Sequence, residues 1–314
     1  PAIYNNLIIN SSGFTATQFS NLTLNGNLNV KSGTFRLNDN ISTTKLTLTI
    51  NGNVTVDDGA FITVGNGVTN TAIGGSGGAA PFLNYYLNFH TVIIKGDFTN
   101  NGTSAIGTGL LAFNGTVTQV IGGSTSTTVG QMTDNNNVKL KSPATINSVL
   151  NFQSGKMSLL ASNLTMGSSG SITGYDNSKY INASGTGKLN QNVGASNKVY
   201  PVGNAASYVP VTLNNSGTAD NYGVRVFDDV LNNGTSGGTI ASINNTVDMS
   251  WVVDETVAGG SNLTATCQWN GANEGSLFNR TQAGIGIYNA GIWNPQNAGA
   301  ASGANPYTMT RTGI

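Results

Sequence analysis

The first half of the chain alternates apolar and polar residues in short stretches that end at glycine-containing corners. One phrase covers residues 25–37 (N-G-N-L-N-V-K-S-G-T-F-R-L), returns at residues 51–62, and returns in a shorter form at residues 150–159. Each copy has an apolar, polar, apolar triplet, then two polar residues, a glycine and a further apolar position. This alternation is typical of β-strands, because successive side chains on a strand point to opposite faces.

A corner inside the phrase keeps the strands short. In the first copy, Leu28 and Val30 share one face of a strand, and Gly33 follows two polar residues. Glycine readily adopts the positive φ that a tight corner requires. The phrase therefore predicts a strand, a corner and a second strand, and one such unit cannot bury its apolar face alone.

Stacked copies of the unit can bury that face. The first two copies begin at Asn25 and Asn51, 26 residues apart. A repeat of this length is typical of one coil of a β-solenoid. Later copies are spaced irregularly, so we expect insertions, above all a Gly/Ala/Ser-rich inserted loop near residues 65–81. The many asparagines are expected at corners and in ladders of stacked amides between coils.

The second half of the chain has longer strands and more aromatic residues. Alternation is clear at residues 222–227, 247–253 and 263–269, and Gly/Asn/Ser-rich loops separate these segments. Several such strands in about one hundred residues are typical of an antiparallel β-sandwich. The predicted fold class is therefore all-β, with a β-solenoid at residues 1–192 and a β-sandwich at residues 193–314.

Composition excludes several classes of protein. The 314 residues include 13 Lys and Arg and 13 Asp and Glu, so the formal net charge is zero and only 8% of residues are charged. A nucleic-acid binder needs a basic face, which these few scattered cations do not supply. No apolar run reaches the roughly 20 residues of a membrane-spanning helix. A single cysteine cannot form an internal disulfide, and the uncharged Asn/Thr/Ser/Gly-rich composition suggests an extracellular location.

Several short motifs together resemble a known family. They are G-D-F-T-N-N-G-T at residues 96–103, L-N-F-Q-S-G-K-M at 150–157, Y-P-V-G-N-A-A-S-Y-V-P-V-T-L at 200–213 and W-V-V-D-E at 251–255. This order is similar to that of the repetitive surface proteins of Bacteroidota, which are often adhesins exported by the type IX secretion pathway. The resemblance implies a secreted cell-surface protein, with any export signal outside this segment, and supplies no catalytic residues.

The residues that could support catalysis do not form a recognisable set. Nucleophilic catalysis by serine or cysteine usually needs a histidine base, and the single His90 lies in an aromatic stretch away from Cys267. Acidic residues occur as neighbours at residues 57–58, 228–229 and 254–255, but neighbours on a strand point to opposite faces. We therefore predict no catalytic residues and no enzymatic activity.

Metal binding is a weaker expectation. Asp39, Asp134 and Asp220 lie in Asp/Asn-rich segments whose oxygen atoms could bind Ca²⁺. None of these segments matches an EF-hand or a glycine-rich calcium repeat, and Asx-turns explain the same residues. Calcium is the one cofactor kept open.

Threonine pairs raise the further idea of a flat array that orders water. Thr47-Leu48-Thr49 and Thr116-Val117-Thr118 have the alternation that such an array needs. They do not recur at one fixed spacing, so the sequence does not predict an array.

The predicted function is that of a non-enzymatic structural and adhesive surface protein, a rigid rod plus a sandwich. Self-association head to tail into a filament, or attachment to neighbouring domains of a longer adhesin, is expected. The alternative is a carbohydrate-binding or polysaccharide-cleaving module that contacts surface glycans, with sugar rings stacked on Tyr85, Tyr86, Trp251, Trp269 or Trp293. Trp251 and Trp269 lie on the inward faces of their predicted strands, which favours core packing for these two.

Overall fold

The structure is a computed structural model that describes residues 2–37, 45–64 and 90–314. The described residues form strands and short 3₁₀ turns, without an α-helix, and they build a β-solenoid of about eight turns together with small antiparallel sheets. The prediction of an all-β protein with a β-solenoid is confirmed. No helix within these ranges is long and apolar enough to cross a bilayer.

The chain divides into two compact units. The N-terminal unit comprises residues 1–158 and 162–175, and the C-terminal unit comprises residues 159–161 and 176–314. The sequence pattern placed the boundary later, at residue 192. The inserted loop expected near residues 65–81 lies outside the described residues.

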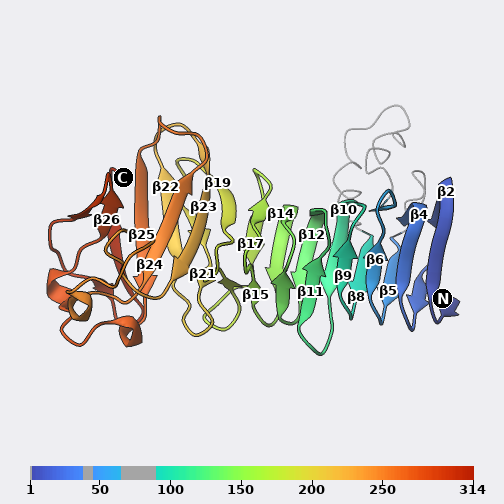
Figure 1. The fold of residues 1–314 in the computed structure, drawn as a ribbon, viewed down its shortest axis with the longest axis horizontal. Helices are drawn as coiled ribbons and strands as arrows, with labels where there is room; N and C mark the ends of the chain where they lie inside the picture. The colour runs from blue at the N-terminus through green and yellow to red at the C-terminus, as the bar shows by residue number, and fades with distance from the viewer. Residues whose placement is uncertain (1, 38–44, 65–89) are drawn as a thin grey trace, which may run out of the picture. The chain divides into compact units, whose positions relative to one another are not determined.

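Three parallel ladders make up the N-terminal unit, and Figure 1 shows their strands stacked in chain order. The first ladder contains β1 (Ala2–Tyr4), β3 (Leu22–Leu24), β5 (Thr47–Ile50), β8 (Thr91–Ile94), the second halves of β10 (Thr103–Phe113), β12 (Thr127–Asp134) and β14 (Ala144–Phe152), and β17 (Ser171–Thr173). The second contains the first halves of β2 (Leu7–Gln18) and β4 (Leu28–Leu37), then β6 (Val54–Val56), β9 (Phe98–Asn100), β11 (Gln119–Gly122), β13 (Val138–Leu140) and β15 (Met157–Ser158). The third contains the second halves of β2 and β4, then β7 (Phe61–Val64), the first halves of β10, β12 and β14, and β16 (Leu164–Met166).

Apolar side chains fill the interior of the coils. Along the first ladder the paired inward positions include Leu24, Ile50, Ile94 and Phe113, and all four are fully buried. Buried apolar area contributes about 25 cal/mol per Å², so each fully buried side chain of this size contributes about 1.5–3 kcal/mol. A coil gains this free energy only when its neighbours cover it, which is why the repeated phrase folds as a stack.

Asparagine side chains connect each coil to the next at the corner before the second ladder. Asn6 Oδ1 accepts a hydrogen bond from the Asn27 backbone N–H at 2.7 Å, and Asn27 Oδ1 accepts one from the Asn53 N–H at 2.8 Å. Asn53 Oδ1 continues the series by accepting from the Asp97 N–H at 2.8 Å. The linked residues are 21, 26 and 44 positions apart, so the corner is preserved while the coil length changes. The expected asparagine ladder therefore exists, and at this corner it runs from side chain to backbone.

A glycine stands directly before Asn27, Asn53 and Asp97, and it makes room for the corner asparagine of the previous coil. A Cβ added to Gly52 would lie 2.3 Å from Asn27 Oδ1, and one added to Gly96 would lie 2.2 Å from Asn53 Oδ1. Neither distance is compatible with a real Cβ contact. Glycine at the position before the corner residue is thus required by the close approach of successive coils.

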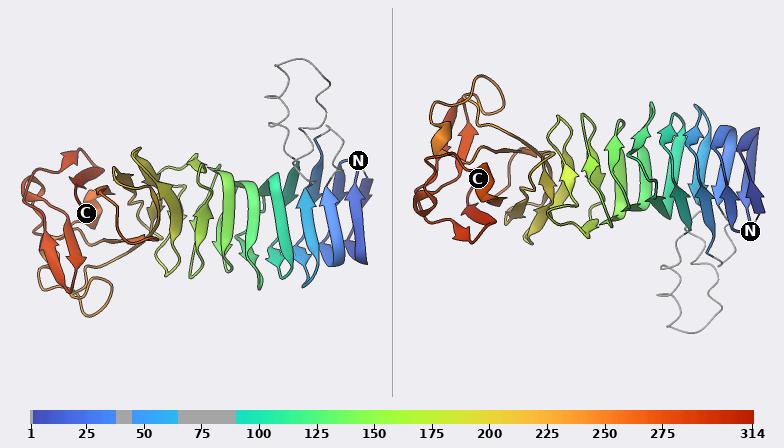
Figure 2. Two further views of the ribbon diagram at one scale, coloured as in Figure 1. Left: turned by 90° about the horizontal axis from the view of Figure 1, so that it is seen from above. Right: turned by 90° about the horizontal axis from the view of Figure 1, so that it is seen from below.

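The C-terminal unit contains small antiparallel sheets. β19 (Leu189–Val193), β23 (Asp220–Phe227) and β24 (Ser250–Glu255) form one antiparallel set, and β18 (Ile181–Asn182) pairs in parallel with β21 (Val202–Gly203). A five-stranded sheet has the order β20 (Lys198–Tyr200), β22 (Val211–Asn215), β25 (Leu263–Trp269), β29 (Tyr307–Arg311) and β28 (Ser302–Gly303). The hairpin of β26 (Gly286–Asn289) and β27 (Ile292–Pro295) and the 3₁₀ turns η2 (Ile243–Asn245), η3 (Gly271–Asn273) and η4 (Arg280–Gln282) complete the unit, and Figure 2 shows it from two further sides.

Polar contacts, buried at Tyr200 and partly buried at Trp251, join the two larger antiparallel sets. The Tyr200 hydroxyl, from the five-stranded sheet, lies 3.1 Å from the carbonyl oxygen of Gln191 in β19 and 2.9 Å from that of Tyr222 in β23. Trp251 Nε1, from β24, donates to the Val209 carbonyl at 2.8 Å. Burial raises the pKa of the Tyr200 phenol, so this hydroxyl remains a hydrogen-bond donor.

Candidate functional site

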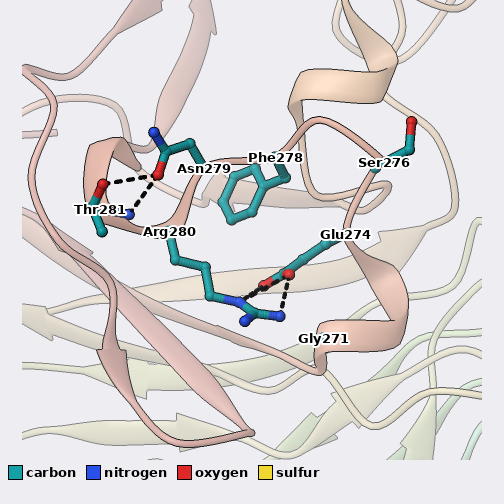
Figure 3. Close-up of a pocket in the computed structure, with 8 residues that line it drawn as sticks. Gly271, Glu274, Ser276, Phe278, Asn279, Arg280 and Thr281 are labelled. Carbon is teal, nitrogen blue, oxygen red and sulfur yellow. Dashed lines mark hydrogen bonds and ion pairs between the residues drawn. The ribbon is translucent and has the colours of Figure 1, made fainter.

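A polar recess in the C-terminal unit lies in the segment that follows β25. Its volume is about 600 Å³, and it is broadly open to solvent. Eight residues line it: Gly271, Glu274, Gly275, Ser276, Phe278, Asn279, Arg280 and Thr281. Figure 3 shows them close up.

An ion pair forms one wall of this recess. Arg280 Nε lies 2.9 and 3.0 Å from the two Glu274 carboxylate oxygens, and Arg280 Nη2 lies 2.7 Å from Oε2. Trp269 Nε1 donates to Glu274 Oε1 at 2.8 Å. Burial raises the pKa of Glu274, but the hydrogen bonds from Arg280 and Trp269 and the positive charge outweigh it, so the pKa lies below its usual value. The hydrogen bond to Glu274 also raises the pKa of Arg280, and both groups stay charged as a neutral pair.

Aromatic rings hold the ion pair in place from behind. The Arg280 guanidinium lies 4.2 Å from the centroid of the Tyr307 ring, a cation–π geometry. Trp269 is buried and contacts both Phe278, edge to face at 5.9 Å, and Tyr307 at 6.1 Å between centroids. The orientation of Arg280 is therefore set by a carboxylate on one side and a ring on the other.

Asn279 caps the start of the turn η4 through its side-chain oxygen. Its Oδ1 accepts hydrogen bonds from the Thr281 N–H at 3.0 Å and from the Thr281 hydroxyl at 2.8 Å. Asn279, Thr281 and Ser276 are exposed to solvent. The recess thus presents an amide nitrogen, two hydroxyls and a guanidinium around a half-buried phenylalanine.

The alternation of residues 263–269 favours core packing over sugar stacking for Trp269, and Trp269 is indeed buried, where it supports the recess from below its surface. Glu274 and Arg280 were not singled out. The sequence nevertheless holds one indication of this ion pair. Glu274 is one of only two glutamates, and it lies six positions before Arg280 in a chain with 8% charged residues.

The other aromatic candidates have structural partners or lie outside the described ranges. Trp251 is half-buried and bonded to Val209, and Trp293 Nε1 donates to the Leu231 carbonyl at 2.9 Å. Tyr85 and Tyr86 lie outside the described residues.

The two residues considered for nucleophilic catalysis also have structural surroundings. His90 Nδ1 accepts the Leu46 N–H at 3.0 Å, and burial, helped by Lys45, lowers its pKa. Cys267 is buried within β25, and this burial raises the pKa of its thiol to about 12. A neutral imidazole and a protonated thiol are the forms expected at neutral pH.

The acidic pairs expected on strands do not point at common targets. Asp228 accepts from Asn204, whereas Asp229 accepts from Thr239 and from the Val230 N–H. Asp254 pairs with Lys188 at 2.5 Å, and this pair is partly exposed to solvent.

The candidate calcium ligands are separated in the structure. Asp220 lies at the start of β23, where its carboxylate accepts the Asn221 and Val257 N–H groups at 2.7 Å. Asp134 lies at the end of β12 inside the solenoid, and Asp39 lies outside the described residues. Across residues 2–37, 45–64 and 90–314, no three His, Cys, Asp or Glu side chains are grouped as metal ligands would be.

Asp134 occupies a position where the coils on either side carry phenylalanine. It pairs with Phe113 in the coil before and with Phe152 in the coil after, and its residue is fully buried. Oδ1 accepts the Asn136 N–H at 3.1 Å, whereas Oδ2 is buried without a hydrogen-bond partner. Burial raises the pKa of this carboxyl to about 8, although the hydrogen bond from Asn136 lowers it.

The third ladder aligns threonines that the sequence leaves at irregular spacings. One line of paired positions on this ladder runs through Thr17, Arg36, Thr63, Ala105, Thr128, Thr145 and Thr165, each paired with the next. Thr47 and Thr49 belong instead to the first ladder, and Thr116 and Thr118 lie outside the strands. Coils of unequal length thus place threonines at the regular strand spacing of about 4.8 Å.

No protein family, curated protein or solved structure shows a significant match to this chain.

Proposed function

We propose that this chain is a non-enzymatic structural and adhesive protein of the cell surface. The observation that carries the proposal is the set of three parallel ladders that runs through the coils of the N-terminal unit. Each inner coil is hydrogen-bonded to the coils before and after it, and stacked apolar side chains fill the interior. Such a stack suits a stiff spacer that presents attachment surfaces.

Two further features support an adhesive rather than a catalytic role. His90, Cys267 and Glu274, which have the side chains most often used in catalysis, are engaged in structural contacts or buried. The threonine file on the third ladder gives the unit a regular face on which Arg36 is the one charged residue of the seven paired positions. A face of this kind is suited to contact with another surface.

The extracellular location and the sandwich are parts of the same proposal. The low charge and the resemblance to Bacteroidota surface proteins support secretion to the cell surface. The buried contacts of Tyr200 and the partly buried hydrogen bond of Trp251 support a sandwich of the antiparallel sheets in the C-terminal unit.

Pulling experiments test the stiff spacer. We expect the N-terminal unit to lengthen in steps under force, because each coil contacts only its neighbours. A coil of 26 residues, such as that between Asn27 and Asn53, lengthens by roughly 90 Å when fully extended. Single-molecule force spectroscopy measures these steps. Unfolding at low force in one event would contradict a spacer, and release of products from polysaccharide or peptide substrates would contradict a non-enzymatic role.

The proposal includes self-association through the first coil. Five large side chains of this coil are exposed: Ile3 (64%), Tyr4 (56%), Ile8 (58%), Phe14 (74%) and Phe19 (67%). Among the described strands, β1 pairs only with β3 and β2 pairs only with β4, so one edge of each is open. We assign this apolar edge to a second copy of the chain. The open edge of β24, which pairs only with β23, is a suitable counterpart for head-to-tail addition.

Charged substitutions test this contact. The double variant Ile8→Lys/Phe14→Lys is expected to remain monomeric at concentrations where the unaltered protein associates, because two buried ammonium groups oppose the contact. Val117→Lys is the matched control, since Val117 is 70% exposed elsewhere in the same unit. Analytical ultracentrifugation and negative-stain images provide the readout. Dispersed monomers of the unaltered protein, or equal association of the double variant, would overturn the assignment.

A further inference from the structure

The recess of residues 271–281 has the size and chemistry of a binding site that the scaffold role does not use. The recess, of about 600 Å³, is broadly open to solvent, so it suits one face of a chain-like ligand better than a small enclosed molecule. Its wall combines the planar groups of Arg280 and Asn279, the hydroxyls of Ser276 and Thr281, and the ring of Phe278. In Figure 3 the Phe278 ring stands next to Asn279 and above the Glu274–Arg280 pair, and Ser276 and Thr281 lie on opposite sides of it.

The charges of the recess favour a neutral ligand. Glu274 holds Arg280 through three hydrogen bonds of 2.7–3.0 Å, so the two charges compensate each other locally. The Glu274 side chain is only 8% exposed, whereas that of Arg280 is 47% exposed. A ligand therefore meets a guanidinium edge whose charge is already balanced, which is a weak site for an anion.

The mixed polar and apolar lining matches an amphipathic ligand. A sugar ring carries hydroxyls around its edge and C–H groups on its faces. Planar amide and guanidinium groups can hydrogen-bond to neighbouring hydroxyls, and an aromatic ring can cover the C–H face. Phe278 is supported by Trp269, and Arg280 by Tyr307, so both would meet the ligand in fixed orientations.

We propose that this recess binds a neutral sugar unit of a polysaccharide. Asn279 is the residue whose role can be isolated. Its Oδ1 is engaged by Thr281, which leaves Nδ2, on an exposed residue at the edge of the recess, as the donor for a ligand hydroxyl. The proposal goes beyond the scaffold role and stands on different residues, all of them in the C-terminal unit.

The test uses the full chain and the variant Asn279→Asp. Aspartate keeps the oxygen that caps η4, so the turn is retained, and it replaces the donor nitrogen with an acceptor. Asn297→Asp makes the same charge change at an exposed residue that does not line the recess. Affinity electrophoresis through soluble glucan, mannan, galactan and xylan, with galacturonan and alginate as acidic probes, compares the three proteins.

We expect at least one neutral polysaccharide to retard the unaltered protein and Asn297→Asp. Asn279→Asp is expected to bind about tenfold more weakly or worse, because a ligand hydroxyl loses its donor. Unchanged circular dichroism of Asn279→Asp would show that the fold is retained. Retardation by acidic polysaccharides alone, retardation by none of the neutral ones, or equal retardation of both variants would overturn the proposal. None of these outcomes bears on the association measured with Ile8→Lys/Phe14→Lys.

Discussion

At pH 8, the Asp134→Asn variant is expected to unfold at a higher urea concentration than the unaltered protein. The carboxyl lies fully buried between positions held by Phe113 and Phe152, and its pKa is about 8 instead of 3.8. In the unfolded chain the group ionises near pH 4, whereas the folded chain keeps the proton until about pH 8. Between these values the unfolded state binds fewer protons, so stability falls as the pH rises.

This linkage has a defined slope. Asp134 lowers the free energy of unfolding by up to about 1.4 kcal/mol for each pH unit between pH 4 and pH 8, and its contribution levels off above pH 8. Asparagine has no such titration. The two proteins should therefore have similar urea midpoints at pH 4 and separate progressively up to pH 8, as followed by circular dichroism. Parallel midpoints across this range would contradict a buried, protonated Asp134.

Asp176→Asn serves as the contrasting control. Asp176 is exposed, and hydrogen bonds from Ser178, followed by Lys179, lower its pKa to about 2. A lowered pKa stabilises the fold above pH 4, and the contribution disappears as the pH falls toward 2. This variant should thus be the less stable protein at neutral pH, opposite in sign to Asp134→Asn.

Gly52→Ala is expected to destabilise the N-terminal unit strongly, by roughly 2–4 kcal/mol. The added Cβ would lie 2.3 Å from Asn27 Oδ1 and 2.8 Å from the Gly26 carbonyl. Removing the side chain with Asn27→Ala should not restore stability, because the backbone clash remains and the hydrogen bond to Asn53 is lost. Thermal unfolding followed by circular dichroism measures the effect.

Gly122→Ala is the matched control for the corner glycine. It lies in β11 of the same unit, where an added Cβ would meet its nearest atoms at 3.6 Å, an ordinary contact distance. Its melting temperature should stay within a few degrees of that of the unaltered protein. Equal losses for Gly52→Ala and Gly122→Ala would show that the corner has no special requirement for glycine.

The fold could be predicted where local pattern and packing agree. Leu28 and Val30 alternate with polar residues, and they are fully buried in the solenoid. Gly33, expected at a corner with positive φ, has a φ of +74°. Both outcomes depend on neighbours along the chain and on the need to cover an apolar face, and these are properties that a sequence records directly.

The candidate site could not be predicted in the same way. Asp134 precedes three asparagines and so resembles a metal ligand in a loop. The register of β12 instead places it inside the solenoid, between the positions of Phe113 and Phe152. The recess brings Glu274 and Arg280 against Tyr307, which is distant in the chain. Neither position follows from local alternation.

By itself, the sequence determined that the chain is all-β, that repeated strand and corner units stack into a solenoid, and that asparagine and glycine occupy the corners. Only the tertiary structure decided which residues meet across coils. Linked corners are separated by 21, 26 and 44 residues, so no fixed period reveals the threonine file or the surroundings of Asp134. The physical reason is that backbone hydrogen bonds between coils set the register, and loops of unequal length between the corners leave that register unchanged.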